Sequence, residues 1–110
     1  MKNLIIHERW LNLILSGKKT WEIRSQGTSI RGEICLAFRS YRYGAVTLFD
    51  VRKMTIDELN QNFDKHRVPS KELREYLHGK DYGFVYVLRD VIKHNKPVPI
   101  PRAYGKWIED

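Results

Sequence analysis

The octapeptide Gly17-Lys18-Lys19-Thr20-Trp21-Glu22-Ile23-Arg24 lies where two periodicities of this sequence meet. Before it, the apolar stretch Trp10-Leu11-Asn12-Leu13-Ile14-Leu15-Ser16 belongs to a helix that we predict over residues 8–16. Gly17 is its expected end, because glycine readily adopts the left-handed backbone that terminates helices. Residues 20–24 then alternate like a strand, with Trp21 and Ile23 on one face and Glu22 and Arg24 on the other. A turn between a rigid helix and a rigid strand can hold a functional site firmly.

The rest of the chain predicts one compact domain over residues 1–110. Further strands are expected over residues 2–6, 33–38, 45–53, 82–92 and 105–108, and loops over 25–32 and 39–44. Thr55 and Glu58 form a capping-box pattern that starts a second helix, and a third is expected over residues 69–77. Strands with a few short inserted helices favour an α+β fold with a largely antiparallel sheet. Closing that sheet into a small barrel would remove its edges.

The positive charge is concentrated in the first half of the chain. Residues 1–53 carry ten Lys or Arg against four Asp or Glu, a net charge of +6, and residues 54–110 carry ten against nine, a net charge of +1. A basic surface attracts phosphate groups in a salt-dependent way, so the imbalance is compatible with a nucleic-acid partner.

Several classes of protein are excluded by pattern. No stretch is apolar enough for a signal peptide or a membrane span, so we expect a cytoplasmic protein with no membrane partner. The single cysteine, Cys35, lies in an apolar strand and is expected to be a small core residue, which excludes a disulfide fold. The four histidines share no ligand spacing, and no phosphate-binding glycine loop is present. The sequence therefore predicts neither a metal site nor a cofactor.

Lys19, Glu22 and Arg24 are the first candidate site. On a surface, Lys19 and Glu22 would form a weak ion pair worth about 0–1 kcal/mol. In a cleft, the same lysine could hold a phosphate or, if desolvated, act as a base or nucleophile, with Glu22 taking or giving a proton. Arg24 shares a strand face with Glu22, so it could pair with Glu22 or bind a phosphate bidentately.

The segment Arg39-Ser40-Tyr41-Arg42-Tyr43-Gly44 is the second candidate site. It alternates basic and aromatic residues, and single-stranded nucleic acid is held by phosphate contacts together with base stacking. We therefore expect Arg39, Arg42 and Tyr41 to contact RNA. The alternative is a solvated loop with two half-buried tyrosines.

The pattern Gly17-x-Lys19-x-x-Glu22-x-Arg24 resembles the signature of the ASCH domain family, the activating-signal-cointegrator homology domains. The resemblance extends over nearly the whole chain. It includes Trp10 in the opening helix, Gly32-Glu33-Ile34 in a strand, the late apolar strand Tyr82–Val91, and the closing segment Val98-Pro99-Ile100-Pro101-Arg102 before Gly105-Lys106-Trp107.

The resemblance implies a small, mostly antiparallel β-barrel of the PUA-like type with short helices, and a cleft beside the barrel lined by Lys19, Glu22 and Arg24. Single-stranded RNA or a modified nucleoside is the ligand it implies. Some family members are ribonucleases, and one subgroup hydrolyses the amide of an acetylated cytidine, with a threonine where Glu22 stands here. The alternative to a binding domain is thus a hydrolase in which Lys19 and Glu22 are catalytic. An apolar cleft would instead indicate a protein-interaction domain.

Overall fold

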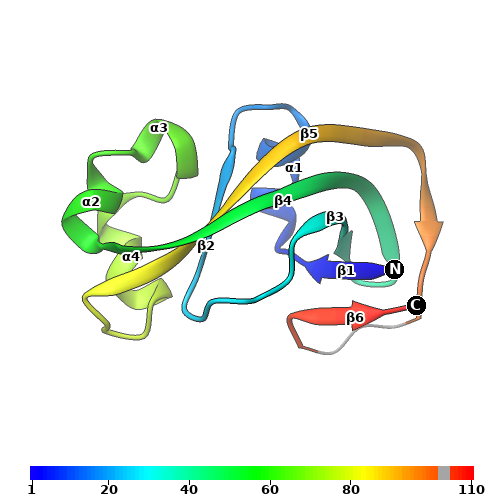
Figure 1. The fold of residues 1–110 in the computed structure, drawn as a ribbon. Helices are drawn as coiled ribbons and strands as arrows, with labels where there is room; N and C mark the ends of the chain where they lie inside the picture. Colours follow the sequence, from blue (N-terminus) through cyan, green and yellow to red (C-terminus); the bar gives the residue numbers. More distant parts are fainter. Residues whose placement is uncertain (102–104) are drawn as a thin grey trace.

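The structure, a computed structural model, describes residues 1–101 and 105–110, so Arg102 of the proline-rich segment lies outside the described residues. In chain order, the elements are β1 (Lys2–Ile5), α1 (Glu8–Leu15), β2 (Trp21–Arg24), β3 (Gly32–Phe38), β4 (Tyr41–Thr55), α2 (Ile56–Asn60), α3 (Phe63–His66), α4 (Ser70–Tyr76), β5 (Tyr82–Pro99) and β6 (Trp107–Glu109). Helices α2–α4 form one insertion between β4 and β5, and they gather at one end of the molecule (Figure 1).

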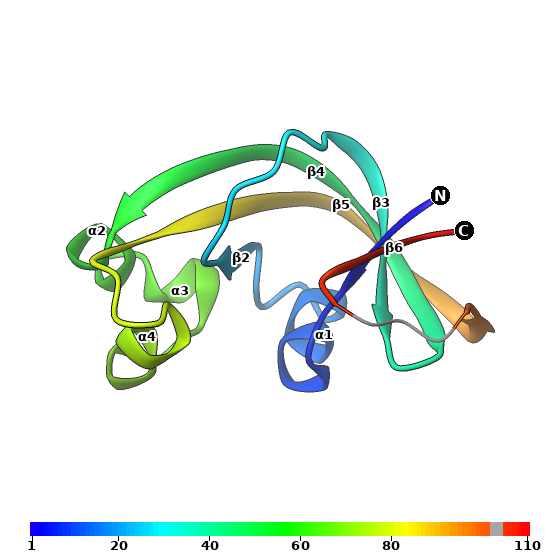
Figure 2. The same cartoon turned by 90° about the horizontal axis from the view of Figure 1, so that it is seen from below.

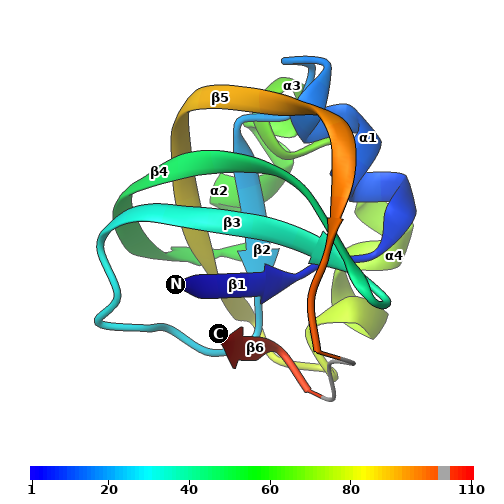
Figure 3. The same cartoon turned by 90° about the vertical axis from the view of Figure 1, so that its right-hand side faces the viewer.

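One strongly curved sheet forms the body of the protein. Its strands run in the order β2-β5-β4-β3-β1-β6, and every neighbouring pair is antiparallel except β1 with β3. The long strands β4 and β5 form an arch with α1, α3 and α4 beneath it and α2 at one end of it (Figure 2), and viewed from the side the strands curve around the middle of the molecule (Figure 3). The α+β, barrel-like fold expected from the sequence is confirmed. Hydrogen bonding between strands leaves the barrel open between its two edge strands, β2 and β6.

Gly17 ends α1, as the sequence predicts. Its φ of 82° is left-handed, and its N–H donates to the carbonyl of Ile14 while the N–H of Lys18 donates to the carbonyl of Leu13. These two bonds make a Schellman motif, which satisfies carbonyls that the helix itself leaves unpaired. The chain is thereby turned from the helix toward β2 within three residues.

The loop predicted over residues 39–44 is wrong in its extent, because most of these residues belong to the hairpin of β3 and β4. The turn consists of Arg39 and Ser40 alone, and β4 begins at Tyr41, whose register partner in β5 is Pro99. Gly44 lies within β4 and not in the turn. A side chain at this position would meet the carbonyl oxygen of Ile92 in β5 at 2.6 Å, so glycine here allows β4 and β5 to approach closely.

The helical insertion begins with the predicted capping box. The Thr55 hydroxyl accepts from the backbone N–H of Glu58, whose carboxylate accepts from the backbone N–H of Thr55. The single helix expected here is two short helices, α2 and α3, and Phe63 at the start of α3 is 45% exposed. Cys35 is buried in β3, which confirms its place in the core.

Candidate functional site: a buried Lys-Glu-Arg cluster beside a cleft

The segment between α1 and β2 is held by backbone hydrogen bonds on both sides. The N–H of Thr20 donates to the carbonyl of Lys65 at the end of α3, and its carbonyl accepts from Leu88 in β5. Since the backbone is fixed on both sides, the side chain of Lys19 is directed into the protein rather than into solvent. This lysine is 1% exposed, as is Glu22.

Lys19, Glu22 and Arg24 form one charged cluster, in which both ion pairs considered in the sequence analysis are present. Nζ of Lys19 lies 3.4 Å from Oε1 of Glu22, and Nε of Arg24 donates to Oε2 of Glu22 at 2.8 Å. Nη2 of Arg24 donates to the carbonyl of Ile5, 2.9 Å away at the end of β1. Arg24 therefore links the edge strand β2 to β1 across the open side of the barrel.

Burial lowers the pKa of Lys19 from 10.5 to about 8. Desolvation is the largest cause, and the opposite effect of Glu22 only partly offsets it. Nζ lies 4.9 Å from the ring centre of Trp10, a distance at which a cation is attracted to the ring. A lysine whose pKa is shifted this far by its surroundings is typical of functional sites, although structural ion pairs also produce such shifts.

Lys19 also binds the helical insertion, because Nζ donates to the backbone carbonyl of His66, the last residue of α3. His66 is itself completely buried. Its Nδ1 accepts from the N–H of Val68, so its Nε2 carries the proton and donates to the carbonyl of Leu59 at 2.6 Å. Desolvation lowers the pKa of His66, which keeps this tautomer neutral.

A cleft of about 560 Å³ opens beside this cluster, between the end of β2 and helix α4. Its lining residues are Arg24, Ser25, Glu72, Glu75, Tyr76, His78 and Lys106. The lining mixes both signs of charge, and Glu72 is already paired with Arg9 of α1 at 2.9 Å. Burial raises the pKa of Tyr76, so its phenol stays protonated.

Only one of the three clustered residues lines this cleft. Arg24 does so with 11% of its side chain exposed, whereas Lys19 and Glu22 are sealed behind it. Among the described residues, Nη1 of Arg24 has no hydrogen-bond partner. The guanidinium is therefore fixed on one side and has a donor left for a ligand on the other.

The opposite wall of the cleft was not predicted from the sequence. Glu72, Glu75 and Tyr76 share a face of α4 through their spacing of three and four residues, which was visible in the sequence. Their position opposite Arg24 was not visible, because it depends on how the insertion packs against the sheet.

The second candidate segment is divided between two faces of the sheet. Side chains alternate along a strand, so Tyr41 and Tyr43 share one face and Arg42 lies on the other. Tyr41 and Arg39 line a separate cavity of about 430 Å³ next to α1.

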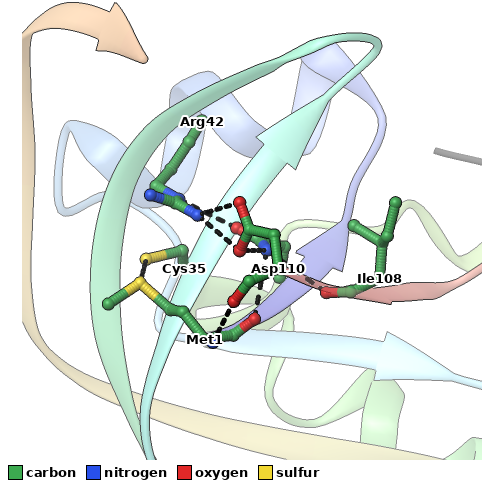
Figure 4. A network of polar contacts seen from close by, with 6 residues as sticks. Met1, Cys35, Arg42, Ile108 and Asp110 are labelled. Carbon is green, nitrogen blue, oxygen red and sulfur yellow. Dashed lines mark hydrogen bonds and ion pairs between the residues drawn. The ribbon is translucent and has the colours of Figure 1, made fainter. Parts of the chain in front are cut away.

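Arg42 is engaged with the two ends of the chain (Figure 4). Its Nη2 donates to both carboxylate oxygens of Asp110, at 2.7 and 2.6 Å, and its Nε donates to Oδ1 of the buried Asn3 at 2.9 Å. Asn3 also donates to the Asp110 carboxylate, and this hydrogen bond together with the charge of Arg42 lowers the pKa of Asp110. These contacts favour a structural role for Arg42, and its contact with RNA stays a prediction.

Replacing Arg42 with alanine is expected to destabilise the fold. The buried Oδ1 of Asn3 would lose its donor, which costs about 1–3 kcal/mol. Urea denaturation followed by circular dichroism measures this loss. Arg74→Ala is the control, because its ion pair with Asp81 is long, at 3.6 Å, and exposed. A folded Arg42→Ala protein of unchanged stability that binds RNA poorly would reverse this assignment.

Two further observations concern metals and membranes. In residues 1–101 and 105–110, no group of three or more His, Cys, Asp or Glu side chains is placed to hold a metal ion. None of the helices in the same residues is long and apolar enough to cross a membrane.

The curved sheet, its helical insertion and the cluster at the start of β2 define a small α+β protein of the PUA-like fold class. The family model of the ASCH domain matches residues 4–106, and the chain therefore belongs to the ASCH domain family. The resemblance inferred from the motif is confirmed.

Several solved structures share this fold. The ASCH protein of Zymomonas mobilis superimposes with a TM-score of 0.71 at 20% identity, covering 90% of this chain and 71% of its own. A tyrosine-to-phenylalanine mutant of that same protein gives a TM-score of 0.77 at 18% identity, covering 89% and 74%. The hypothetical protein PH0355 gives 0.56 at 16% identity, covering 79% and 95%. At these identities the similarity concerns the fold alone. None of the curated protein sequences matches the chain.

Proposed function

We propose that this protein binds single-stranded RNA or a nucleoside in the cleft that Arg24 lines. The observation that carries the proposal is the guanidinium of Arg24, which Glu22 and the Ile5 carbonyl hold at the cleft with Nη1 unpaired among the described residues. A fixed planar donor of this kind suits a phosphate or the edge of a base. Membership of the ASCH domain family, which is generally thought to bind RNA, supports the same function.

The other lining residues suit a nucleoside. A cleft of about 560 Å³ is within the size range of small-molecule sites. The ring of Tyr76 offers a surface for a base, and the carboxylate of Glu75 can accept from an amino group or a ribose hydroxyl. Lys106 adds a positive charge for a phosphate.

In this proposal Lys19 and Glu22 position Arg24 and do not touch the ligand. Glu22 holds the guanidinium directly, and Lys19 holds Glu22 while it is bonded to the His66 carbonyl. Their burial makes the arrangement rigid, so that little ordering remains to be done when a ligand binds.

Binding by Arg24 variants tests the proposal. Arg24→Ala is expected to weaken binding of cytidine, adenosine and a labelled RNA of about six nucleotides by roughly tenfold or more, the effect of one charged hydrogen bond. Arg24→Lys keeps the charge but loses the planar fork, so its binding should also fall. Calorimetry and fluorescence anisotropy measure the affinities.

The matched control is Arg52→Ala. Arg52 is 46% exposed, is paired with Asp50, and does not line the cleft. Circular dichroism and thermal melts would first establish that each variant is folded. Folded Arg24 variants that bind as tightly as the wild type would refute the proposal.

The pKa of Lys19, about 8, favours a second candidate function, a hydrolase of RNA or of an N4-acylated cytidine. An amine with this pKa is partly neutral near physiological pH and can act as a base or nucleophile. Since Lys19 is sealed from solvent here, this function would also require the side chain to leave the His66 carbonyl. Product analysis with N4-acetylcytidine and with RNA, with and without divalent metal, is the test. Turnover that rises with pH near 8 and is lost in Lys19→Met would establish the hydrolase, and no turnover would remove it.

A further inference from the structure

We propose that the cavity next to the β3–β4 hairpin is a second nucleotide-binding subsite, which holds a neighbouring base and phosphate of the same single-stranded RNA. This inference deepens the proposed function and rests on it. The cavity measures about 430 Å³ and shares no lining residue with the cleft at Arg24. One wall comes from the first turns of α1, with Glu8 and Asn12, and the other from the hairpin, with Phe38, Arg39, Tyr41 and Tyr43.

The hairpin offers an aromatic surface. Tyr41 is 44% exposed, whereas Tyr43 on the same strand face is partly buried and packs against the core. The two rings are 6.5 Å apart and inclined by 59°, so the more buried tyrosine supports the exposed one. A supported but exposed ring next to a cavity is a suitable platform for stacking a base.

Arg39 provides the charge for a phosphate. Its guanidinium lies 5.1 Å from the ring centre of Phe38, which holds it at the rim of the cavity without neutralising it. Its φ is 57°, a left-handed conformation that glycine would adopt at less cost. An arginine at a strained turn position, where glycine fits better, points to a use for its side chain.

The polar residues of α1 complete the subsite. Glu8 and Asn12 are four residues apart and therefore lie on one face of the helix. The carboxylate of Glu8 accepts hydrogen bonds and the amide of Asn12 both donates and accepts, which suits the polar edge of a base. Asn12 is exposed, so neither the backbone nor the core occupies its side chain.

Helix α1 also connects the two sites. Arg9, next to Glu8, pairs at 2.9 Å with Glu72, which lines the cleft at Arg24. The first turn of α1 therefore lies between the cleft and the second cavity. An RNA strand that occupies both would pass over this turn, with its phosphates near Arg9 and Arg39.

The test compares RNA with a nucleoside. Tyr41→Ala is expected to weaken binding of the labelled RNA of about six nucleotides by roughly 5- to 100-fold, the loss of one stacked base, and to leave adenosine binding unchanged. Arg39→Gly should weaken RNA binding and reduce the slope of log affinity against log salt concentration by about 0.7, the loss of one phosphate contact on a single strand. Thermal stability of Arg39→Gly should equal or exceed that of the wild type, since glycine relieves the turn.

The controls are Phe49→Ala and Arg89→Ala. These two residues also pair an exposed ring with an arginine, 3.4 Å from the ring centre, but they line neither cavity. If Tyr41→Ala and Arg39→Gly bind RNA like the wild type while Arg24→Ala does not, the second subsite is refuted and the proposed function stands. If Tyr41→Ala weakens adenosine as much as RNA, the two sites are not separate and the subsite is also refuted. If wild-type protein binds neither ligand, both proposals fail together.

Discussion

Glu22→Ala is expected to remove about 3–5 kcal/mol of folding free energy, the usual cost of leaving a buried charge without its partner. Among the described residues, Glu22 is the only carboxylate that pairs with Lys19 and Arg24. The side chain of Lys19 has no exposure and that of Arg24 only 11%, so solvent cannot replace the lost carboxylate. Because small domains are typically stable by about 5–15 kcal/mol, the variant should be close to unfolding.

Urea denaturation measures this effect, and two further variants make it specific. Glu22→Gln keeps the shape and one acceptor but loses the charge, so it should also be strongly destabilised. The double variant Lys19→Met with Glu22→Gln should regain part of the loss, because one of the unpaired cations is gone. The control is Glu109→Ala, whose ion pair with Lys2 is exposed and should contribute little. A Glu22→Gln protein as stable as the control would contradict the buried network.

The second large effect is a pH dependence that Lys19→Met should abolish. The pKa of Lys19 is about 8 in the folded protein and 10.5 in the absence of its surroundings. Between these values the unfolded chain binds more protons than the folded chain, so stability rises with pH. The gain from this group starts near pH 8 and is complete near 10.5, a total of about 3 kcal/mol for a shift of this size.

The measurement is the difference between the unfolding free energies of wild type and Lys19→Met across this pH range. Burial raises the pKa values of Tyr76 and Tyr86, so these two groups make the folded protein less stable as the pH rises above 10. Their contributions are the same in both proteins and cancel in the difference. The wild type should gain about 3 kcal/mol on the variant between pH 8 and 10.5. Lys2→Met, which changes an exposed lysine, should show no such gain. Parallel curves for wild type and Lys19→Met would show that Lys19 is not desolvated.

The charged cluster of Lys19, Glu22 and Arg24 could be found from the sequence because its residues are close together along the chain. The glycine stop of α1 and the spacing of Lys19, Glu22 and Arg24 are local features, and local spacing determines which side chains share a strand face. Burial of the lysine was not predictable in this way. The burial results from packing against α3. The backbone carbonyl of His66, the last residue of α3 and 47 residues after Lys19, accepts a hydrogen bond from the ammonium group.

The boundaries of the strands also depend on contacts between distant parts of the chain. Residues 39–44 contain a glycine and alternating polar residues, which is typical of a loop. They are strand from Tyr41 onward in the structure because β5 continues to Pro99 and pairs with β4 across Tyr41 and Arg42. Prolines near the end of a strand remain compatible with pairing where their missing N–H would face away from the partner. Such long-range pairing overrides local preference, and a single sequence does not reveal it.

The two walls of the cleft at Arg24 belong to different parts of the chain, which gives ligand binding a mechanical consequence. One wall is the end of β2, and the other is α4, which belongs to the helical insertion. The insertion is joined to the segment before β2 through α3, by the bonds from Lys19 to His66 and from Thr20 to Lys65, and α4 is joined to α1 by the ion pair of Glu72 with Arg9. A ligand that contacts both walls acts as a cross-link between the sheet and the inserted helices. A bound ligand is therefore expected to stabilise the helical insertion against local unfolding. Slower amide exchange in α3 and α4 would then report an occupied cleft.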